Sequence, residues 1–235
     1  MARLARITVP GFPHHVVQRG YRDRQVFEVE ADYRRYLEWL REYAIRYSVD
    51  IWAYCLMPNH VHIICVPNSE NALARAFNSL HMRYAQYFNG RRHAHGPIWR
   101  PRFMSCILDD ATVREEVRFI ENNPVRKKIV FRADDYAWSS AFAHRDSKTD
   151  QILSERCFLL NEIKDWQAFL IEQNDQSSIS RVRSHLRTGR PAGNPEFVQT
   201  LEKMMGRHLK PLPIGRPRGK TGNQTLNSTG RCSST

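Results

Sequence analysis

The spacing of apolar residues divides the first half of the chain into a regular series of predicted elements. Strict alternation indicates strands, and apolar positions three and four residues apart indicate helices with one buried face. In chain order we expect a strand at 14–19, a helix at 31–47, strands at 51–56 and 60–66, a helix from Asn71 to beyond Tyr84, a strand at 103–108, and a helix that starts near 109–110 and is stopped by Pro124.

This β-α-β-β-α-β order predicts an α+β fold. The expected architecture is an antiparallel sheet of about four to five strands with helices on its face, a ferredoxin-like core. Later segments have helical spacing around Trp166, at 178–188 and at 195–205. Asn194 and Gly206 have the residue types of a helix start and a helix stop for the last of these.

Charge is unevenly distributed along the 235 residues. The chain carries 36 Lys and Arg against 24 Asp and Glu, a formal charge of +12. Residues 181–235 hold eleven of those cations and two of the acids. We therefore expect a folded domain at 1–145, a helical, basic, DNA-binding appendage at 146–220 and a disordered polar tail at 221–235.

Several classes of protein are excluded by composition. No apolar run is long enough to cross a membrane, and the first residues do not have the pattern of a signal peptide. The five cysteines are scattered without CxxC spacing, so neither a disulfide framework nor a zinc ribbon is expected. These features favour a cytoplasmic protein without a membrane partner.

Candidate chemistry begins with His60 and His62, two residues apart on a predicted strand. Side chains alternate along a strand, so both imidazoles project from one face and form half of a metal site. A pair of hydrogen-bonding histidines is the alternative interpretation. On the third predicted helix, Phe119 and Asn123 lie one turn apart beside the apolar stripe, either as the edge of a site or as ordinary packing and helix-end residues.

The run Tyr54-Cys55-Leu56-Met57-Pro58-Asn59-His60-Val61-His62 closely resembles the HUH signature of single-tyrosine transposases, and more narrowly of the REP-associated branch. Other segments resemble the same branch, and together the match covers residues 1–145. These segments are 11–20, 83–89, 98–103, 123–126 and 138–140.

The resemblance implies cleavage and rejoining of single-stranded DNA near a hairpin. It implies that His60, His62 and Asn123 hold one divalent cation, Mg²⁺ or Mn²⁺, which would polarise and orient the scissile phosphate. No nucleotide cofactor is implied. In this family the nucleophile is a tyrosine four residues before the polar ligand, and here that position is Phe119.

Phenylalanine lacks the hydroxyl that forms a phosphotyrosine. Three alternatives follow. The protein is a silenced relative that still binds DNA as a regulator, another tyrosine such as Tyr84, Tyr87 or Tyr136 substitutes, or the metal activates water.

Two regions are candidate DNA contacts. Proteins that bind single strands use cationic side chains interleaved with aromatic side chains on which bases stack. The first region, around residues 91–102, supplies cationic and aromatic side chains close together. The alternative for Trp99 is that it is a core residue. The second region resembles an AT-hook or, alternatively, a non-specific basic tail. The helices at 178–188 and 195–205 have the order of a small helix-turn-helix unit. The candidate residues are Arg91, Arg92, Trp99, Arg100 and Arg102 in the first region, and Arg216, Arg218 and Lys220 in the second.

Overall fold

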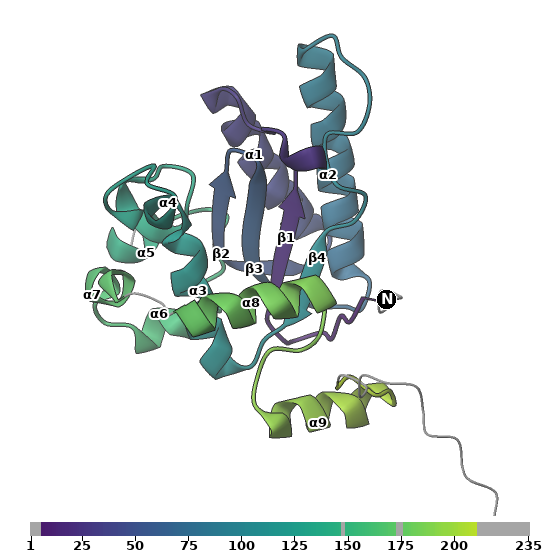
Figure 1. Ribbon diagram of the computed structural model, residues 1–235, viewed down its shortest axis with the longest axis vertical. Coiled ribbons are helices and arrows are strands. Elements are labelled where there is room, and N and C mark those ends of the chain that lie inside the picture. The colour runs from purple at the N-terminus through teal and green to yellow at the C-terminus, as the bar shows by residue number, and fades with distance from the viewer. Residues whose placement is uncertain (1–5, 147–148, 173–175, 211–235) are drawn as a thin grey trace, which may run out of the picture.

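A four-stranded antiparallel sheet forms the centre of the molecule (Figure 1). The computed structural model describes residues 6–146, 149–172 and 176–210. The strand order is β2-β3-β1-β4, which confirms the predicted ferredoxin-like sheet. The strands are β1 (His14–Arg19), β2 (Val49–Met57), β3 (His60–Pro67) and β4 (Met104–Ile107).

Two long helices cover the first face of the sheet. α1 (Glu30–Arg46) and α2 (Ala72–Arg91) pack against each other. Their aromatic side chains are buried against those strand residues, every second one along each strand, that point toward the two helices. Val16 of β1 and Val61 and Ile63 of β3 belong to this core. The predicted alternation of β3 is therefore confirmed, because Val61 and Ile63 face α1 and α2 whereas Ile64 belongs to the core on the other face.

The second face of the sheet is covered by α3 (Asp110–Glu121) and by later helices. Val113, Val117 and Ile120 form the buried stripe of α3, and the Asp109 carboxylate caps the helix by accepting from Thr112 N at 2.8 Å. Helices thus cover both faces of the sheet. The shorter elements are η1 (Tyr21–Asp23), α4 (Asn123–Arg126), η2 (Ala133–Asp135), α5 (Ala141–Asp146), α6 (Leu159–Glu162) and α7 (Trp166–Ile171).

Pro124 does not stop the third predicted helix in the expected way. α3 already ends at Glu121, and Pro124 lies in the first turn of α4. Proline is accepted there because its missing N–H is unsatisfied at a helix start anyway. The consequence is that Asn123 stands at the junction of two helices.

The expected boundary near residue 145 does not separate two bodies. α8 (Gln176–Thr188) crosses the second face of the sheet (Figure 1) and buries Ile179, Val182 and Leu186 in the same core as α3. Ala192 then pairs with Leu108 beside β4. The described part of the appendage is therefore integral to the sheet domain.

The last described helix, α9 (Pro195–Met205), begins and ends where the sequence predicts. The Asn194 side chain accepts from Phe197 N at 2.8 Å, and Gly206 has a φ of 61°, the left-handed region that glycine tolerates. Because α8 is embedded in the core, α8 and α9 do not form a free-standing helix-turn-helix unit.

Candidate functional site

The structure brings His60, His62 and Asn123 together on the second face of the sheet. The two imidazoles project side by side from β3 with ring centroids 4.9 Å apart. His60 Nε2 lies 3.2 Å from Asn123 Nδ2, which approaches from the junction of α3 and α4. All three side chains are buried.

A chain of hydrogen bonds fixes the orientation of His62. His62 Nδ1 lies 2.8 Å from His15 Nε2, and His15 Nδ1 lies 2.6 Å from a Glu116 carboxylate oxygen. The carboxylate can only accept, so His15 donates from Nδ1 and a neutral His15 accepts at Nε2 from His62 Nδ1. This arrangement leaves the lone pair of His62 Nε2 free for a ligand.

His60 has an equivalent support. Its Nδ1 lies 2.5 Å from Asn59 Oδ1, so Nδ1 donates and Nε2 carries the lone pair. Metal-binding histidines commonly have their second nitrogen held in this way. Asn123 Oδ1 accepts from Arg126 at 3.2 Å.

Sequence reasoning missed His15 and Glu116. A signal for His15 existed, because β1 alternates and places His15, Val17 and Arg19 on one face, opposite His62 and His60 in the register. Glu116 lies seven residues before Asn123, two helical turns along α3. A fully buried acid on the apolar side of a helix needs a partner, but the partner could not be named without the sheet pairing.

Burial keeps both candidate ligands neutral. Burial and the positive charges of Arg19 and Lys127 lower the pKa of His60 to about 3. Burial, followed by the charges of the neighbouring histidines and arginines, lowers the pKa of His62 well below its usual value. Neutral imidazoles keep the lone pairs that metal binding requires.

Cations surround these neutral rings. The pKa of Arg126 is lowered to about 10, chiefly by burial and also by the charge of Arg183 on α8. Burial also lowers the pKa of Arg19, with Arg100 and Arg183 contributing. Cationic side chains from three separate elements therefore create a positive field that favours an anion at this position.

The donor set fits a divalent cation that is shared with an anionic ligand. Within the described ranges, no group of three or more His, Cys, Asp or Glu side chains could hold a metal. Two neutral imidazole nitrogens and one amide oxygen are nevertheless suitable ligands once the Asn123 amide presents Oδ1. Without a carboxylate among them, these ligands leave the metal's positive charge for a bound phosphate to balance.

Phe119 lies directly beside this group. Its ring centroid is 5.9 Å from that of His62, and the Arg126 guanidinium carbon lies 4.1 Å above the ring centroid. Phe119 is 5% exposed and belongs to the second core. Phe119 thus lies at the edge of the candidate site and is also a packed core residue, so both interpretations of this position apply.

None of the three candidate substitute tyrosines is placed to replace a hydroxyl at Phe119. Tyr84 and Tyr87 lie on α2, which covers the opposite face of the sheet. The Tyr84 hydroxyl donates to Val26 O at 2.5 Å, and that of Tyr136 donates to Leu56 O at 2.7 Å. Burial raises the pKa of both Tyr84 and Tyr136, which disfavours the reactive phenolate.

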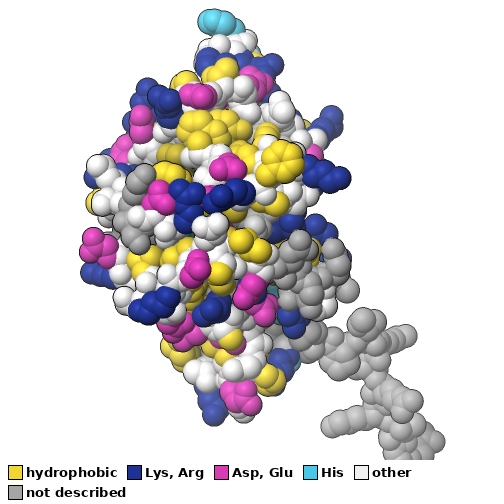
Figure 2. All heavy atoms as spheres, turned by 90° about the vertical axis from the view of Figure 1, so that its left-hand side faces the viewer, with side chains coloured by type: hydrophobic (Ala, Val, Ile, Leu, Met, Phe, Trp, Pro, Cys, Tyr) yellow, Lys and Arg dark blue, Asp and Glu magenta, His cyan; other side chains and the backbone are white. Residues whose placement is uncertain are grey.

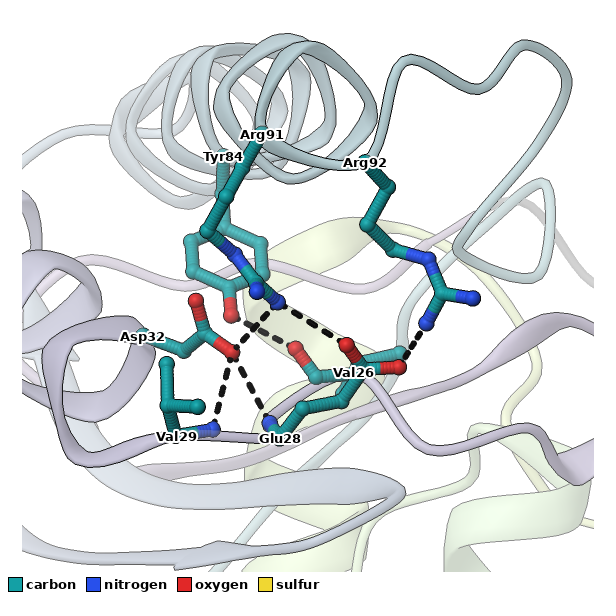
Figure 3. A network of polar contacts seen from close by, with 7 residues as sticks. All are labelled: Val26, Glu28, Val29, Asp32, Tyr84, Arg91 and Arg92. Carbon is teal, nitrogen blue, oxygen red and sulfur yellow. Dashed lines mark hydrogen bonds and ion pairs between the residues drawn. The ribbon is translucent and has the colours of Figure 1, made fainter.

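Arg91 and Arg92 form internal ion pairs in the structure (Figure 3). Arg91 donates to Glu28 at 2.9 Å and to the buried Asp32 at 3.1 Å, and Arg92 also pairs with Glu28. These contacts join the end of α2 to the start of α1. Both guanidinium groups are therefore already engaged in stabilising the helix pair.

The other candidate DNA contacts differ in their exposure to solvent. Trp99 is 7% exposed and packs in the first core, which corrects the expectation of an aromatic platform there. Arg100 and Arg102 are exposed, and Arg100 pairs with Asp23 at 2.9 Å. The AT-hook-like residues Arg216, Arg218 and Lys220, like the tail after them, lie outside the described residues.

Comparisons with known proteins give matches that include one family model and two solved structures. A family model described as "Transposase IS200 like" matches residues 8–123. A REP-associated tyrosine transposase solved bound to a REP hairpin is 19% identical, with a TM-score of 0.50 over 66% of this chain and 92% of that one. A transposase-like structure from Deinococcus radiodurans R1 is also 19% identical, with a TM-score of 0.37 over 52% of this chain and 97% of that one.

No curated protein matches the sequence. Within the described residues, no helix has the length and hydropathy needed to cross a membrane. The family match and the shared fold confirm the resemblance that the motifs indicated.

Proposed function

We propose, from the match of residues 8–123 to the family model of IS200-like transposases, that this chain binds single-stranded or hairpin DNA without forming a phosphotyrosine. In this proposal a backbone phosphate lies against His60, His62 and Asn123, which hold Mg²⁺ or Mn²⁺. The metal would supply Lewis-acid polarisation of that phosphate.

The observation that carries the proposal is the position of Phe119. Its ring lies beside the imidazole of His62, where a tyrosine would present a hydroxyl to the phosphate. The Tyr84 and Tyr136 hydroxyls are bonded to backbone carbonyls elsewhere. DNA binding at a preserved ligand set, without the covalent step, is therefore the function that fits best.

The side chains around the ligands have distinct tasks in this scheme. Glu116 and His15 hold the His62 ring in the tautomer that binds a cation. Arg126 lies beside the Asn123 amide and, with Arg19, contributes positive charge that attracts DNA. A hairpin is the favoured substrate because the solved structure that shares this fold was bound to a REP hairpin.

A labelled hairpin oligonucleotide incubated with Mn²⁺ tests the proposal. We expect the wild-type protein to retard the hairpin on a native gel and to give no covalent adduct on a denaturing gel. The variant Phe119→Tyr restores a hydroxyl four residues before Asn123, so we expect an adduct from it. The matched control Phe119→Tyr/His60→Ala is expected to give none, because it lacks one ligand.

Each other outcome counts against the proposal. An adduct from the wild-type protein means that another nucleophile acts. A cleaved product with a free 5′-phosphate and no adduct, lost in His60→Ala, identifies water as the nucleophile. Absence of binding by both proteins contradicts the DNA-binding function itself. Binding without an adduct from Phe119→Tyr shows that the scissile phosphate does not reach the histidines.

A further inference from the structure

A cleft of about 730 Å³ opens directly beside the candidate ligands, between α4 and α7. Asn122 and Arg126 line it, and Asn123 lies between them in the sequence. Arg126 also contacts both Phe119 and the Asn123 amide. Arg126 is therefore a wall residue that the cleft shares with the candidate cation site.

The cleft carries a fully exposed aromatic side chain. Phe131 is 99% exposed, and Ile171 on the opposite side of the opening is 70% exposed. Burial of an aromatic ring is strongly favourable, so one left in solvent at the mouth of a cleft marks a binding surface. On this side of the molecule, hydrophobic side chains lie among charged side chains of both signs (Figure 2).

The charge around Phe131 is positive. Arg126, Lys128, Arg132 and Arg145 line the cleft, with Asp134 as the one carboxylate among its lining residues. Asp134 is already engaged, because it accepts from both Arg132 and Arg145. Within the described chain, neither Lys127 nor Lys128 forms an ion pair, so both ammonium groups are available to an anion.

The backbone at Lys128 supports the same interpretation. Lys128 has a φ of 56°, in the left-handed region, at the end of α4. Its N–H donates to Val125 O and the N–H of Ile129 donates to Pro124 O, a helix ending that usually contains glycine. A lysine in this conformation is less favourable than glycine, and this residue places a cation at the mouth of the cleft.

We propose that this cleft binds the single strand of DNA that continues from the candidate cation site, with one base stacked on Phe131 and phosphates contacting Arg126 and Lys128. The combination of an aromatic platform and a basic track is the general mode of single-strand recognition. The inference rests on the proposed function and adds a subsite for the unpaired strand. A protein partner is disfavoured by the excess of cations over carboxylates in the lining.

The test uses two oligonucleotides, a blunt hairpin and the same hairpin with a single-stranded extension that contains 2-aminopurine. We expect Phe131→Ala to weaken binding of the extended hairpin about 5-fold to 150-fold, the range for loss of one base–aromatic stack. Binding of the blunt hairpin stays unchanged. The wild-type protein quenches 2-aminopurine fluorescence on binding, Phe131→Ala does not, and Phe131→Trp does.

Two further variants exclude a merely structural effect. Met82 is exposed on α2, on the other side of the sheet, and Met82→Ala is expected to bind both hairpins like the wild type. Lys128→Gly relieves the backbone, so its melting temperature stays level or rises. We nevertheless expect its affinity for the extended hairpin to fall less steeply with salt concentration, with a slope lower by about one released counterion.

The outcomes separate this inference from the function on which it rests. If the wild-type protein binds neither oligonucleotide, both fail together. If it binds the extended hairpin and Phe131→Ala binds equally well with the same quenching, the subsite is wrong and the function stands. A Phe131→Ala variant that changes only the sedimentation of the protein, and not its DNA binding, identifies the cleft as an interface between copies and overturns the inference.

Discussion

Glu116 acts on the candidate ligands through another residue. Its carboxylate bonds to His15, which in turn bonds to His62, so one buried charge sets the tautomer of two rings. Because the Glu116 carboxylate reaches His62 only through His15, it does not itself occupy a coordination position on the cation. It thus strengthens a ligand without occupying a coordination position.

We predict that Glu116→Gln weakens Mn²⁺ binding about 10-fold in the presence of hairpin DNA. The amide keeps the shape but loses the charge that favours a donating His15 Nδ1–H. Free Mn²⁺ measured by electron paramagnetic resonance gives the affinity. Glu115→Gln, which changes a partly exposed neighbour on α3 that pairs with Arg181, serves as the matched control, and equal Mn²⁺ affinities in the two variants would contradict the relay.

At the scale of elements, Asp32 joins the start of α1 to the end of α2 (Figure 3). Its side chain is fully buried and accepts from Glu28 N at 2.8 Å, from Val29 N at 3.2 Å and from Arg91 at 3.1 Å. The carboxylate therefore satisfies two N–H groups at the helix start and an arginine from the neighbouring helix.

Replacement of Asp32 by alanine removes all three bonds at once. We predict that Asp32→Ala lowers the free energy of unfolding by about 1–3 kcal/mol, the cost of a lost cap and unsatisfied buried donors. Urea unfolding measures the change. Glu30→Ala removes only an exposed ion pair with Arg34 on the same helix and is expected to cost less than about 0.5 kcal/mol; a comparable loss in both variants would refute the role of Asp32.

The elements themselves were predictable where periodicity is local. The alternation around His60 and the start and stop residues of α9 identified their elements correctly, because each depends on near neighbours. Long-range packing was not predictable in the same way. The burial of Trp99 and the position of α8 over the sheet depend on contacts between distant segments, which no local pattern contains.

In the candidate site too, the residues that depend on local patterns were predictable and those that depend on long-range packing were not. Its three predicted ligands lie on two elements whose faces were readable, and the structure brings them together. The roles of His15 and Glu116 depend on which strands pair, and the role of Phe131 depends on its not being covered by any residue that the structure describes.

At the scale of the whole molecule, buried neutral histidines make stability depend on pH. Burial lowers the pKa of His14 to about 4 and of His60 and His81 to about 3. In the unfolded chain these groups bind protons below about pH 6.5. The unfolded state therefore takes up more protons as the pH falls, and the free energy of unfolding decreases from about pH 6.5 downward.

We predict a loss of about 1 kcal/mol per buried histidine between pH 7.5 and about 5.5, measured by urea unfolding. His81→Gln should show a shallower dependence, since it removes one of these groups. His93→Gln changes an exposed position and should keep the full slope. Unfolding midpoints that do not move over this range would show that the histidines are not held neutral.

The position of α8 has a consequence for how the protein is made. The histidines of β3 leave the ribosome before α8, the helix that covers part of their side of the sheet and brings Arg183 near Arg19 and Arg126. Until α8 has been synthesised, the apolar residues of the second core that pack with Ile179, Val182 and Leu186 lack these partners.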